Sequence, residues 1–321
     1  MGRGSTVSVA GNICIDVLVR DVAEASDAVD GAEVARDGWG ANVQLHQRPI
    51  EPTIGGGGVG LALVLAHFGH EVDLNTNLGT DPWGDMAARQ VRAAGVSLRP
   101  PQPEASATNV ILLRRDGRRT SHYYPGPAVD WKRSLEATAP SSESASIWFF
   151  ASGFGRVEEE DLRQLLAVFA EFRRRGASTV FDPSPWFGYK GVPAELMRAV
   201  FRELTCLVAT EEELRPWQRS GSAEELACDL LDAGPDRVVV KRGAAGAVWA
   251  CRQEGSGSVP TEPIESGNTT GAGDSFNGRL LHELSRGARC AAAVAAAVDM
   301  ATEVARRGVG ISGVLGPDAN R

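Results

Sequence analysis

The segment Asn268–Ser275 reads Asn-Thr-Thr-Gly-Ala-Gly-Asp-Ser and brings two glycines, a small residue and an aspartate to one turn. Apolar residues then recur at helical spacing, at Phe276, Leu280, Leu281 and Leu284. The glycines therefore precede a helix, and the free N–H groups and positive dipole end of a helix N-terminus bind anions. Because glycine has no Cβ, phosphate oxygens can approach this backbone closely.

Asp274 lies just inside this predicted anion site, where its carboxylate would repel a bound phosphate. General-base chemistry gives it a role there, because it would accept the proton of a hydroxyl that attacks the phosphate. Gly271, Ala272 and Gly273 would donate backbone N–H groups to the transferring phosphoryl group. The alternative is that Asp274 only complements the helix dipole.

Further motifs precede this segment along the chain. The segment itself resembles the C-terminal signature of the PfkB (ribokinase-like) carbohydrate kinase family, Asp-Thr-x-Gly-Ala-Gly-Asp. Sequences similar to the family's other motifs occur in the family's order: Gly11–Asp16, Gly55–Leu63, Gly79–Asp85, Asp182–Trp186, Thr210–Glu213 and Lys241–Gly246. Because the matches run across most of the chain, it is identified as a member of that family.

This resemblance implies a single ribokinase-like kinase domain over residues 1–321. The implied fold class is α/β, with a doubly wound, mainly parallel sheet flanked by helices and a small β-sheet lid. The implied activity is ATP-dependent transfer of the γ-phosphate to a hydroxyl of a sugar or sugar-like small molecule. Mg²⁺ is implied with ATP, because the charge of the γ-phosphate must be neutralised during transfer. The family's lid often carries the dimer interface, so a homodimer through the lid is expected.

Asp16 is the main acceptor-binding residue that the resemblance implies. It follows an apolar strand, and an unpaired carboxylate between Ile15 and Val17 would be costly, which favours a ligand or a partner for it. By resemblance Asp16 accepts hydrogen bonds from sugar hydroxyls, with Asn12 on the same side of the strand. The expected acceptor site also includes three glycine positions, of which the first two let the backbone approach the sugar: Gly56, Gly57 and Gly60.

The nucleotide side of the site is expected at the ends of later strands. By resemblance Glu213 organises Mg²⁺ and its waters. The residues expected to bind the nucleotide are Thr210, Lys241, Gly243, Gly246, Thr270 and Asp299. For Lys241 and Asp299, solvated structural roles are the alternative.

Three positions depart from the family's motifs. Where the family's first glycine motif ends in a sugar-binding asparagine, this chain has Gly60, so one or two sugar contacts are missing or come from elsewhere. Thr210 replaces the asparagine of Asn-x-x-Glu, so a hydroxyl would hold water at the metal. Asn268 replaces the aspartate that opens the signature, and the lost charge weakens the case for activation by K⁺. The acceptor is therefore expected to differ from those of the common sub-families.

Strand and helix signals alternate along the chain, which favours a parallel, doubly wound sheet with ligands beyond the carboxyl ends of its strands. The predicted strands are Thr6–Ala10, Val72–Leu78, Ile147–Ala151, Ser178–Phe181, Cys206–Ala209 and Val238–Val240. The predicted helices are Leu61–Phe68, Pro82–Ala94, Glu158–Arg175, Ala223–Asp232 and the alanine-rich stretch Ala288–Ala305.

Extended segments without intervening helices predict a separate small sheet, the lid. They are Ile13–Val19, Val43–Ile50, Asn109–Arg114 and Arg118–Tyr124, so the lid is expected from residues of about 12–20, 42–54 and 107–125. Asp116-Gly117 is a hairpin turn signal between the last two segments. Trp39 is either an aromatic residue in the lid or at its rim, or a residue that only packs under a loop.

Composition argues against several classes of protein. A net charge of −8 over 321 residues disfavours a nucleic-acid or anionic-membrane surface, since either needs a basic patch. The five cysteines stand singly, which indicates buried thiols in a reducing compartment. Charged residues in Ala288–Ala305 argue against a membrane span, and no signal peptide is apparent. A cytoplasmic protein is expected.

Two alternatives to a sugar kinase stay open. A nucleoside kinase with an adenosine-like acceptor would need lid aromatics to stack on the base, such as Trp39, Tyr123 and Tyr124. A degenerate, non-catalytic homologue would only bind nucleotide or sugar; Asp274 argues against it, and the three departures named above argue for it. A dehydrogenase is disfavoured, because no Gly-x-Gly-x-x-Gly follows the first strand.

Overall fold

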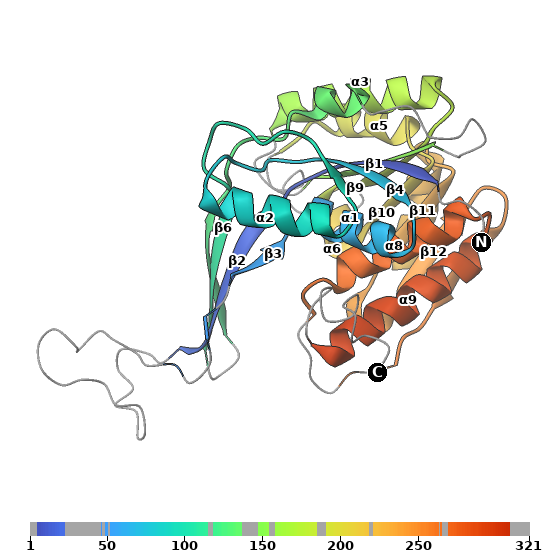
Figure 1. The fold of residues 1–321 in the computed structure, drawn as a ribbon. Coiled ribbons are helices and arrows are strands. Elements are labelled where there is room, and N and C mark those ends of the chain that lie inside the picture. The colour runs from blue at the N-terminus through green and yellow to red at the C-terminus, as the bar shows by residue number, and fades with distance from the viewer. Residues whose placement is uncertain are drawn as a thin grey trace, which may run out of the picture.

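The computed structural model describes residues 5–22, 46, 49–50, 52–114, 118–136, 147–153, 158–184, 191–217, 221–262, 264 and 269–308. Four sequence features discussed above lie outside these residues: Trp39, Asp116-Gly117, Pro185-Trp186 and Asn268. The described chain contains two sheets of very different size (Figure 1).

The larger sheet has nine strands, in the spatial order β13 (Gly255–Val259), β12 (Ala247–Cys251), β11 (Arg237–Lys241), β10 (Cys206–Thr210), β9 (Ser178–Asp182), β8 (Ile147–Ser152), β1 (Thr6–Ala10), β4 (Glu71–Asn75) and β5 (Ser97–Leu98). Neighbouring strands pair in parallel, except that β12 is antiparallel to both β11 and β13. The predicted mainly parallel α/β sheet is confirmed. The edge hairpin of β12 and β13 is absent from the prediction, because β13 reads Gly-Ser-Gly-Ser-Val and has low strand propensity.

Helices cover both faces of this sheet (Figure 1). On one face lie α1 (Gly57–His67), α2 (Pro82–Ala93), α8 (Ala272–Ser285) and α9 (Cys290–Arg307), and on the other η1 (Trp131–Glu136), α3 (Glu159–Arg174), α5 (Ala194–Arg202) and α7 (Ala223–Asp232). In β8, Trp148 and Phe150 pack on the α1 side, while Phe149 and Ala151 pack on the α3 side. Burial on both faces explains the continuous apolar run of this strand. In the described ranges, none of these helices is long and apolar enough to span a membrane.

The first helix begins earlier than its sequence predicts. α1 starts at Gly57 instead of Leu61, so the glycine motif forms the first turn of the helix. Gly56 precedes it with a φ of 111°, a conformation that favours glycine. The glycine-rich stretch is therefore part of a buried helix and not a loop before one.

The smaller sheet is the lid, with strands in the order β3 (Pro52–Gly55), β2 (Cys14–Val22), β6 (Thr108–Arg114) and β7 (Arg119–Tyr124). It stands away from the larger sheet (Figure 1). Most of the strand predicted at Val43–Ile50 lies outside the described residues; residues 46, 49 and 50 are described and are not in a strand, and β3 begins at Pro52. A proline is tolerated at the first position of such an edge strand.

The path of the chain reverses direction in the larger sheet at β1. From β1 the chain proceeds outward to β4 and β5, then returns to β8 and continues through β9, β10 and β11 on the other side. The crevice beyond the carboxyl ends of β1 and β8 is therefore a topological switch point, where open α/β sheets bind their ligands.

Candidate active site

The glycine-rich turn before α8 has the geometry of an open helix N-terminus. Gly271 is the N-cap, with a φ of 82° in the left-handed region that favours glycine. The Ala272 N–H donates to the Thr269 carbonyl oxygen (3.1 Å), so this expected donor is already paired. Gly273 is exposed, and among the described residues a Cβ there would meet only Lys241 Nζ, at 4.0 Å. The turn therefore has room for a ligand at Gly273.

The Asp274 side chain lies between α8 and the first turn of α1. An ideal Cβ at Gly60 would be 2.5 Å from Asp274 Oδ2, and one at Gly57 would be 3.6 Å from Oδ1. The same Cβ position at Gly57 is 2.7 Å from Ser152 Oγ, at the carboxyl end of β8. Asp274 is thus brought to the switch point of the sheet, where a ligand is expected.

Burial raises the pKa of Asp274 to about 7, well above the ordinary value for a carboxyl group. The Lys241 ammonium opposes this rise, whereas the carboxylates of Asp182 and Asp16 add to it. A general base is most effective when its pKa lies near the working pH. The Asp274 carboxylate and the Asp16 carboxylate of the lid are therefore within electrostatic reach of each other.

Lys241, at the end of β11, belongs to a buried polar network. Its Nζ donates to Asp182 Oδ2 (2.9 Å) and to Asn277 Oδ1 (3.3 Å), and Asn277 Nδ2 donates to Asp182 Oδ2 (2.8 Å). The side chains of Lys241 and Asp182 are each 12% exposed. Burial alone would lower the pKa of Lys241, but Asp182, Glu213 and Asp274 hold it above its ordinary value. The Lys241 ammonium is thus largely shielded from solvent and paired with Asp182, which disfavours a solvated role.

Glu213 and Thr210 form a capping box at the start of α6 (Glu211–Leu214). The Thr210 N–H donates to Glu213 Oε2 (2.7 Å), and the Glu213 N–H donates to Thr210 Oγ1 (3.2 Å). Burial, together with the negative charge of Asp182, raises the pKa of Glu213. A carboxylate with incomplete charge compensation fits a hydrated Mg²⁺, which binds one or two carboxylates and the phosphates of a substrate. No group of three or more potential metal ligands occurs within the described ranges, so phosphate and water would supply the remaining ligands.

The acceptor-side residues form a polar row across the lid, made of Asp16, Asn109 and Tyr123 and called here the lid row. Asp16 of β2 is in register with Asn109 of β6, which is in register with Tyr123 of β7, so the three side chains share one face. Asp16 Oδ1 accepts from Asn109 Nδ2 (3.1 Å) and from Cys14 Sγ (3.3 Å). Tyr123 is half-buried, its hydroxyl lies against the Asn12 side chain, and burial raises its pKa. The partner that the partly buried Asp16 requires is thus found in Asn109.

Asn12, expected in the acceptor site, caps α1 in this structure. It is fully buried, and its Oδ1 accepts from the Gly57 N–H (3.0 Å). Its carbonyl oxygen accepts from the N–H groups of Gly58 (3.2 Å) and Val59 (3.3 Å). A Cβ at Gly56 would lie 2.6 Å from the same carbonyl oxygen. The close packing around Asn12 therefore explains the glycine at 56 without a sugar, and the contact with Ser152 explains the glycine at 57.

The other residues expected around the nucleotide lie apart from this network. Gly243, in η2 (Gly243–Ala245), is exposed, whereas a side chain at Gly246 would overlap the Val259 carbonyl oxygen. Thr270 is exposed at the turn before α8, and Asp299 is exposed on α9. Their contact with a nucleotide stays a prediction.

Four residues of this arrangement were not predicted as site residues: Ser152, Asp182, Asn277 and Asn109. Two of them carry a recognisable signal. Asp182 directly follows a buried strand, at the sheet edge where ligands bind. Asn277 interrupts the apolar face of α8 three residues after Asp274, and a buried polar residue in such a position needs a partner.

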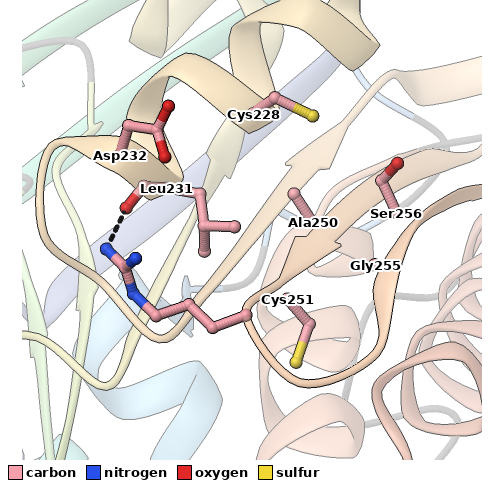
Figure 2. A pocket seen from close by; sticks show the side chains of 8 residues that line it. Cys228, Leu231, Asp232, Ala250, Cys251, Gly255 and Ser256 are labelled. Carbon is pink, nitrogen blue, oxygen red and sulfur yellow. Dashed lines mark hydrogen bonds between the residues drawn. The ribbon is translucent and has the colours of Figure 1, made fainter.

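A separate surface cavity of about 360 Å³ lies between α7 and the β12–β13 hairpin (Figure 2). It is lined by Cys228, Leu231, Asp232, Ala250, Cys251, Arg252, Gly255 and Ser256. The Arg252 Nη2 donates to the Leu231 carbonyl oxygen (2.6 Å). None of these residues belongs to the network around Asp274, so the cavity is not part of the candidate site.

Known proteins share this architecture. The model of the pfkB family carbohydrate kinases matches residues 10–314. Aminoimidazole riboside kinase of Salmonella typhimurium is 27% identical over 241 residues, which cover 72% of this chain and 74% of that protein. Fructokinase of Klebsiella pneumoniae is 27% identical over 236 residues, covering 71% and 75%.

Solved structures show the same fold. Ribokinase from Thermotoga maritima has a TM-score of 0.70 at 20% identity and covers 96% of this chain and 95% of that one. Aminoimidazole riboside kinase from Salmonella enterica, solved with aminoimidazole riboside and an ATP analog, has a TM-score of 0.72 at 21% identity and covers 98% of each chain. With the family match over nearly the whole chain, the conclusion is that this protein belongs to the pfkB family of carbohydrate kinases.

Proposed function

We propose that this protein is an ATP-dependent kinase that transfers the γ-phosphate to a hydroxyl of a small sugar or sugar-like alcohol. The position of Asp274 carries the proposal: its carboxylate lies at the switch point, beside the open turn before α8 and within electrostatic reach of Asp16. Membership in a family of carbohydrate kinases supports the same reaction.

In the proposed reaction the acceptor hydroxyl attacks the γ-phosphorus in line with the leaving group. As the new O–P bond forms, Asp274 accepts the hydroxyl proton. The bond from the γ-phosphorus to the β–γ bridging oxygen breaks, and its electron pair leaves with ADP. The Gly273 N–H and the Lys241 ammonium stabilise the negative charge on the phosphoryl oxygens. Mg²⁺, when bound, neutralises further phosphate charge, and Glu213 is the residue that would hold it.

The lid row favours an uncharged acceptor. Asp16 would accept hydrogen bonds from acceptor hydroxyls, with its side chain oriented by Asn109. Neither the lid row nor Asn12 carries a positive charge, so these residues offer no counter-ion to a sugar acid or a sugar phosphate. A neutral pentose, hexose or riboside therefore fits this side of the site best.

A riboside is the second candidate acceptor, and Tyr123 is the observation that favours it. This aromatic ring belongs to the lid row, as stacking on a base would require, whereas Tyr124 is 49% exposed. A curated relative acts, by its name, on aminoimidazole riboside. A non-catalytic role is disfavoured, because a sensor would not need a carboxylate with a raised pKa at the switch point. We place the enzyme in the cytoplasm and expect a homodimer through the lid, which light scattering would detect.

A panel assay tests the proposed function. The protein is incubated with ATP and Mg²⁺ and with pentoses, hexoses, ketoses, sugar acids or nucleosides, and phosphate esters are identified by ³¹P NMR. A neutral sugar or a riboside should be phosphorylated, and sugar acids should not. If no member of the panel yields a phosphate ester, or if ATP is hydrolysed equally without an acceptor, the proposed function is wrong.

Tyr123 then separates the two acceptor classes. Tyr123→Ala should lower kcat/KM about tenfold or more for a riboside, since base–aromatic stacking contributes roughly 1–3 kcal/mol, and should affect a free sugar little. Tyr124→Ala, a change at the neighbouring exposed tyrosine, is the matched control.

A further inference from the structure

The Asp274 carboxylate lies along one face of the first turn of α1. Gly57 and Gly60 are three residues apart, so they lie on the same side of this helix. The Cβ position of Gly57 is next to Asp274 Oδ1, and that of Gly60 is next to Oδ2, Cγ (2.8 Å) and Cβ (2.8 Å). The bare backbone of Gly60 is therefore one wall of the space that the carboxylate occupies.

The backbone conformation does not explain a glycine at position 60. Its φ is not in the left-handed region, and it lies inside α1, where glycine is less favourable than alanine by about 1 kcal/mol. The space next to Asp274 does explain it, because no side chain of any size can point there without moving the carboxylate. Glycine at position 60 therefore destabilises α1 locally, and only the room that it leaves for the Asp274 side chain offsets this loss.

A second glycine on the same helix crossing offers a comparison. Gly278 of α8 lies one turn after Asp274, and a Cβ there would overlap Val64 of α1. Gly60 and Gly278 therefore both permit the close approach of α1 and α8. Of the two, Gly60 is the one whose Cβ position meets the Asp274 side chain.

We propose that Gly60 is a positioning residue for the Asp274 carboxylate: by lacking a side chain, it holds the carboxylate against α1, oriented toward the turn before α8. The N-terminal end of α1 adds to this arrangement, because the positive end of the helix dipole favours a carboxylate beside the first turn. The catalytic consequence rests on the proposed function, while the contact itself does not.

Gly60→Ala and Gly278→Ala test the proposal as a matched pair. Both changes crowd the α1–α8 crossing, so both should lower the urea midpoint of unfolding. Gly60→Ala alone should lower kcat, by about a hundredfold for a base displaced by about an ångström, with the KM for ATP nearly unchanged. Equal losses of kcat in the two variants, or wild-type turnover in Gly60→Ala, would overturn the proposal.

A double-mutant cycle tests the contact without any turnover, so it separates this proposal from the proposed function. Asp274→Gly removes the side chain that the new Cβ would meet. The loss of unfolding midpoint caused by Gly60→Ala should then be much smaller in the Asp274→Gly background than in the wild type, while the loss caused by Gly278→Ala should be the same in both. If Gly60→Ala does not fold, recovery of folding in the Asp274→Gly background supports the proposal. An undiminished loss, or no recovery, overturns it.

Discussion

Two helices in the described part of the chain begin at glycine-rich sequence, and they differ in what the backbone N–H groups at their N-terminal ends do. In the first turn of α1, the N–H groups of Gly57, Gly58 and Val59 are all donated to Asn12, at distances of 3.0 to 3.3 Å. Before α8, Gly271 turns the chain in the left-handed conformation, and Gly273 is exposed beside Lys241. A glycine-rich helix N-terminus can bind an anion only where no neighbouring segment already accepts its N–H groups, so of these two helices we expect an anion site at α8.

The glycines of the two turns have different physical roles as a result. In α1 they allow close packing: a Cβ at Gly58 would lie 2.6 Å from the Gly11 carbonyl carbon, and one at Gly60 would meet Asp274. At Gly273, by contrast, the space is open apart from Lys241 Nζ in the part of the chain that is described. The first turn of α1 is thus closely packed against Asp274, and the turn before α8 is the one that we propose faces the ligand.

The largest effect is expected on the α8 side, at the base itself. Asp274→Asn keeps the shape of the side chain but removes its ability to accept a proton. Turnover should fall by about 10²–10⁴-fold, the usual contribution of general-base catalysis. Isothermal titration calorimetry should give nearly the same dissociation constant for ATP as in the wild type. Wild-type turnover in this variant would exclude Asp274 as the base.

Substituting one glycine in each turn should separate ligand binding from stability. Gly273→Val fits the free protein but blocks phosphate approach, so ATP binding should weaken by about 10–100-fold, the worth of a hydrogen bond to a charged group. Gly58→Ala should instead lower the free energy of unfolding by about 1–3 kcal/mol, through overpacking against Gly11. Calorimetry and urea unfolding measure the two effects. Normal ATP binding by the Gly273→Val variant would contradict the proposed difference between the two turns.

The capping boxes of α6 and α7 provide a smaller test on the metal side. Glutamine can replace glutamate in a capping box, so Glu213→Gln should keep the α6 cap while removing the charge. The Mg²⁺ concentration for half-maximal activity should rise about tenfold, as when a residue that supports a metal is changed. Glu225→Gln, in the equivalent exposed box with Ser222, is the control and should leave the Mg²⁺ requirement unchanged. Equal behaviour of the two variants would argue against a metal role for Glu213.

Much of the fold follows from local sequence pattern. β8 and β11 are continuous apolar runs bounded by polar residues, and both strands occur where the pattern predicts them. The sequence pattern predicts secondary structure less well where the local composition favours one structure and the folded protein stabilises another. α1 begins with glycines that read as a loop, and it is helical because Asn12 and the sheet stabilise its first turn. Helix propensity alone does not predict this start.

A site residue could be predicted from the sequence where its residue type has a single chemical reason to occur at that position. Asp274 after Gly-Ala-Gly, and Asp16 after an apolar strand, are such residues, and the structure brings them within electrostatic reach. The contact between Gly60 and Asp274 could not be predicted, because it depends on how closely two helices cross, some 200 positions apart in sequence. Likewise, Asn12 has the side chain of a sugar ligand, and only the packing of α1 shows what its oxygen accepts.

The pH dependence of kcat/KM tests most directly whether the carboxylate at the switch point is the base. Asp274 must be deprotonated to accept the hydroxyl proton, and its pKa is raised by burial to about 7, so kcat/KM should increase with pH and reach half its plateau near pH 7. Lys241→Met removes the cation that opposes this rise, and should move the midpoint to higher pH. A wild-type profile that is flat between about pH 5 and 9, or whose midpoint is that of an ordinary exposed carboxyl near pH 4, would contradict the account.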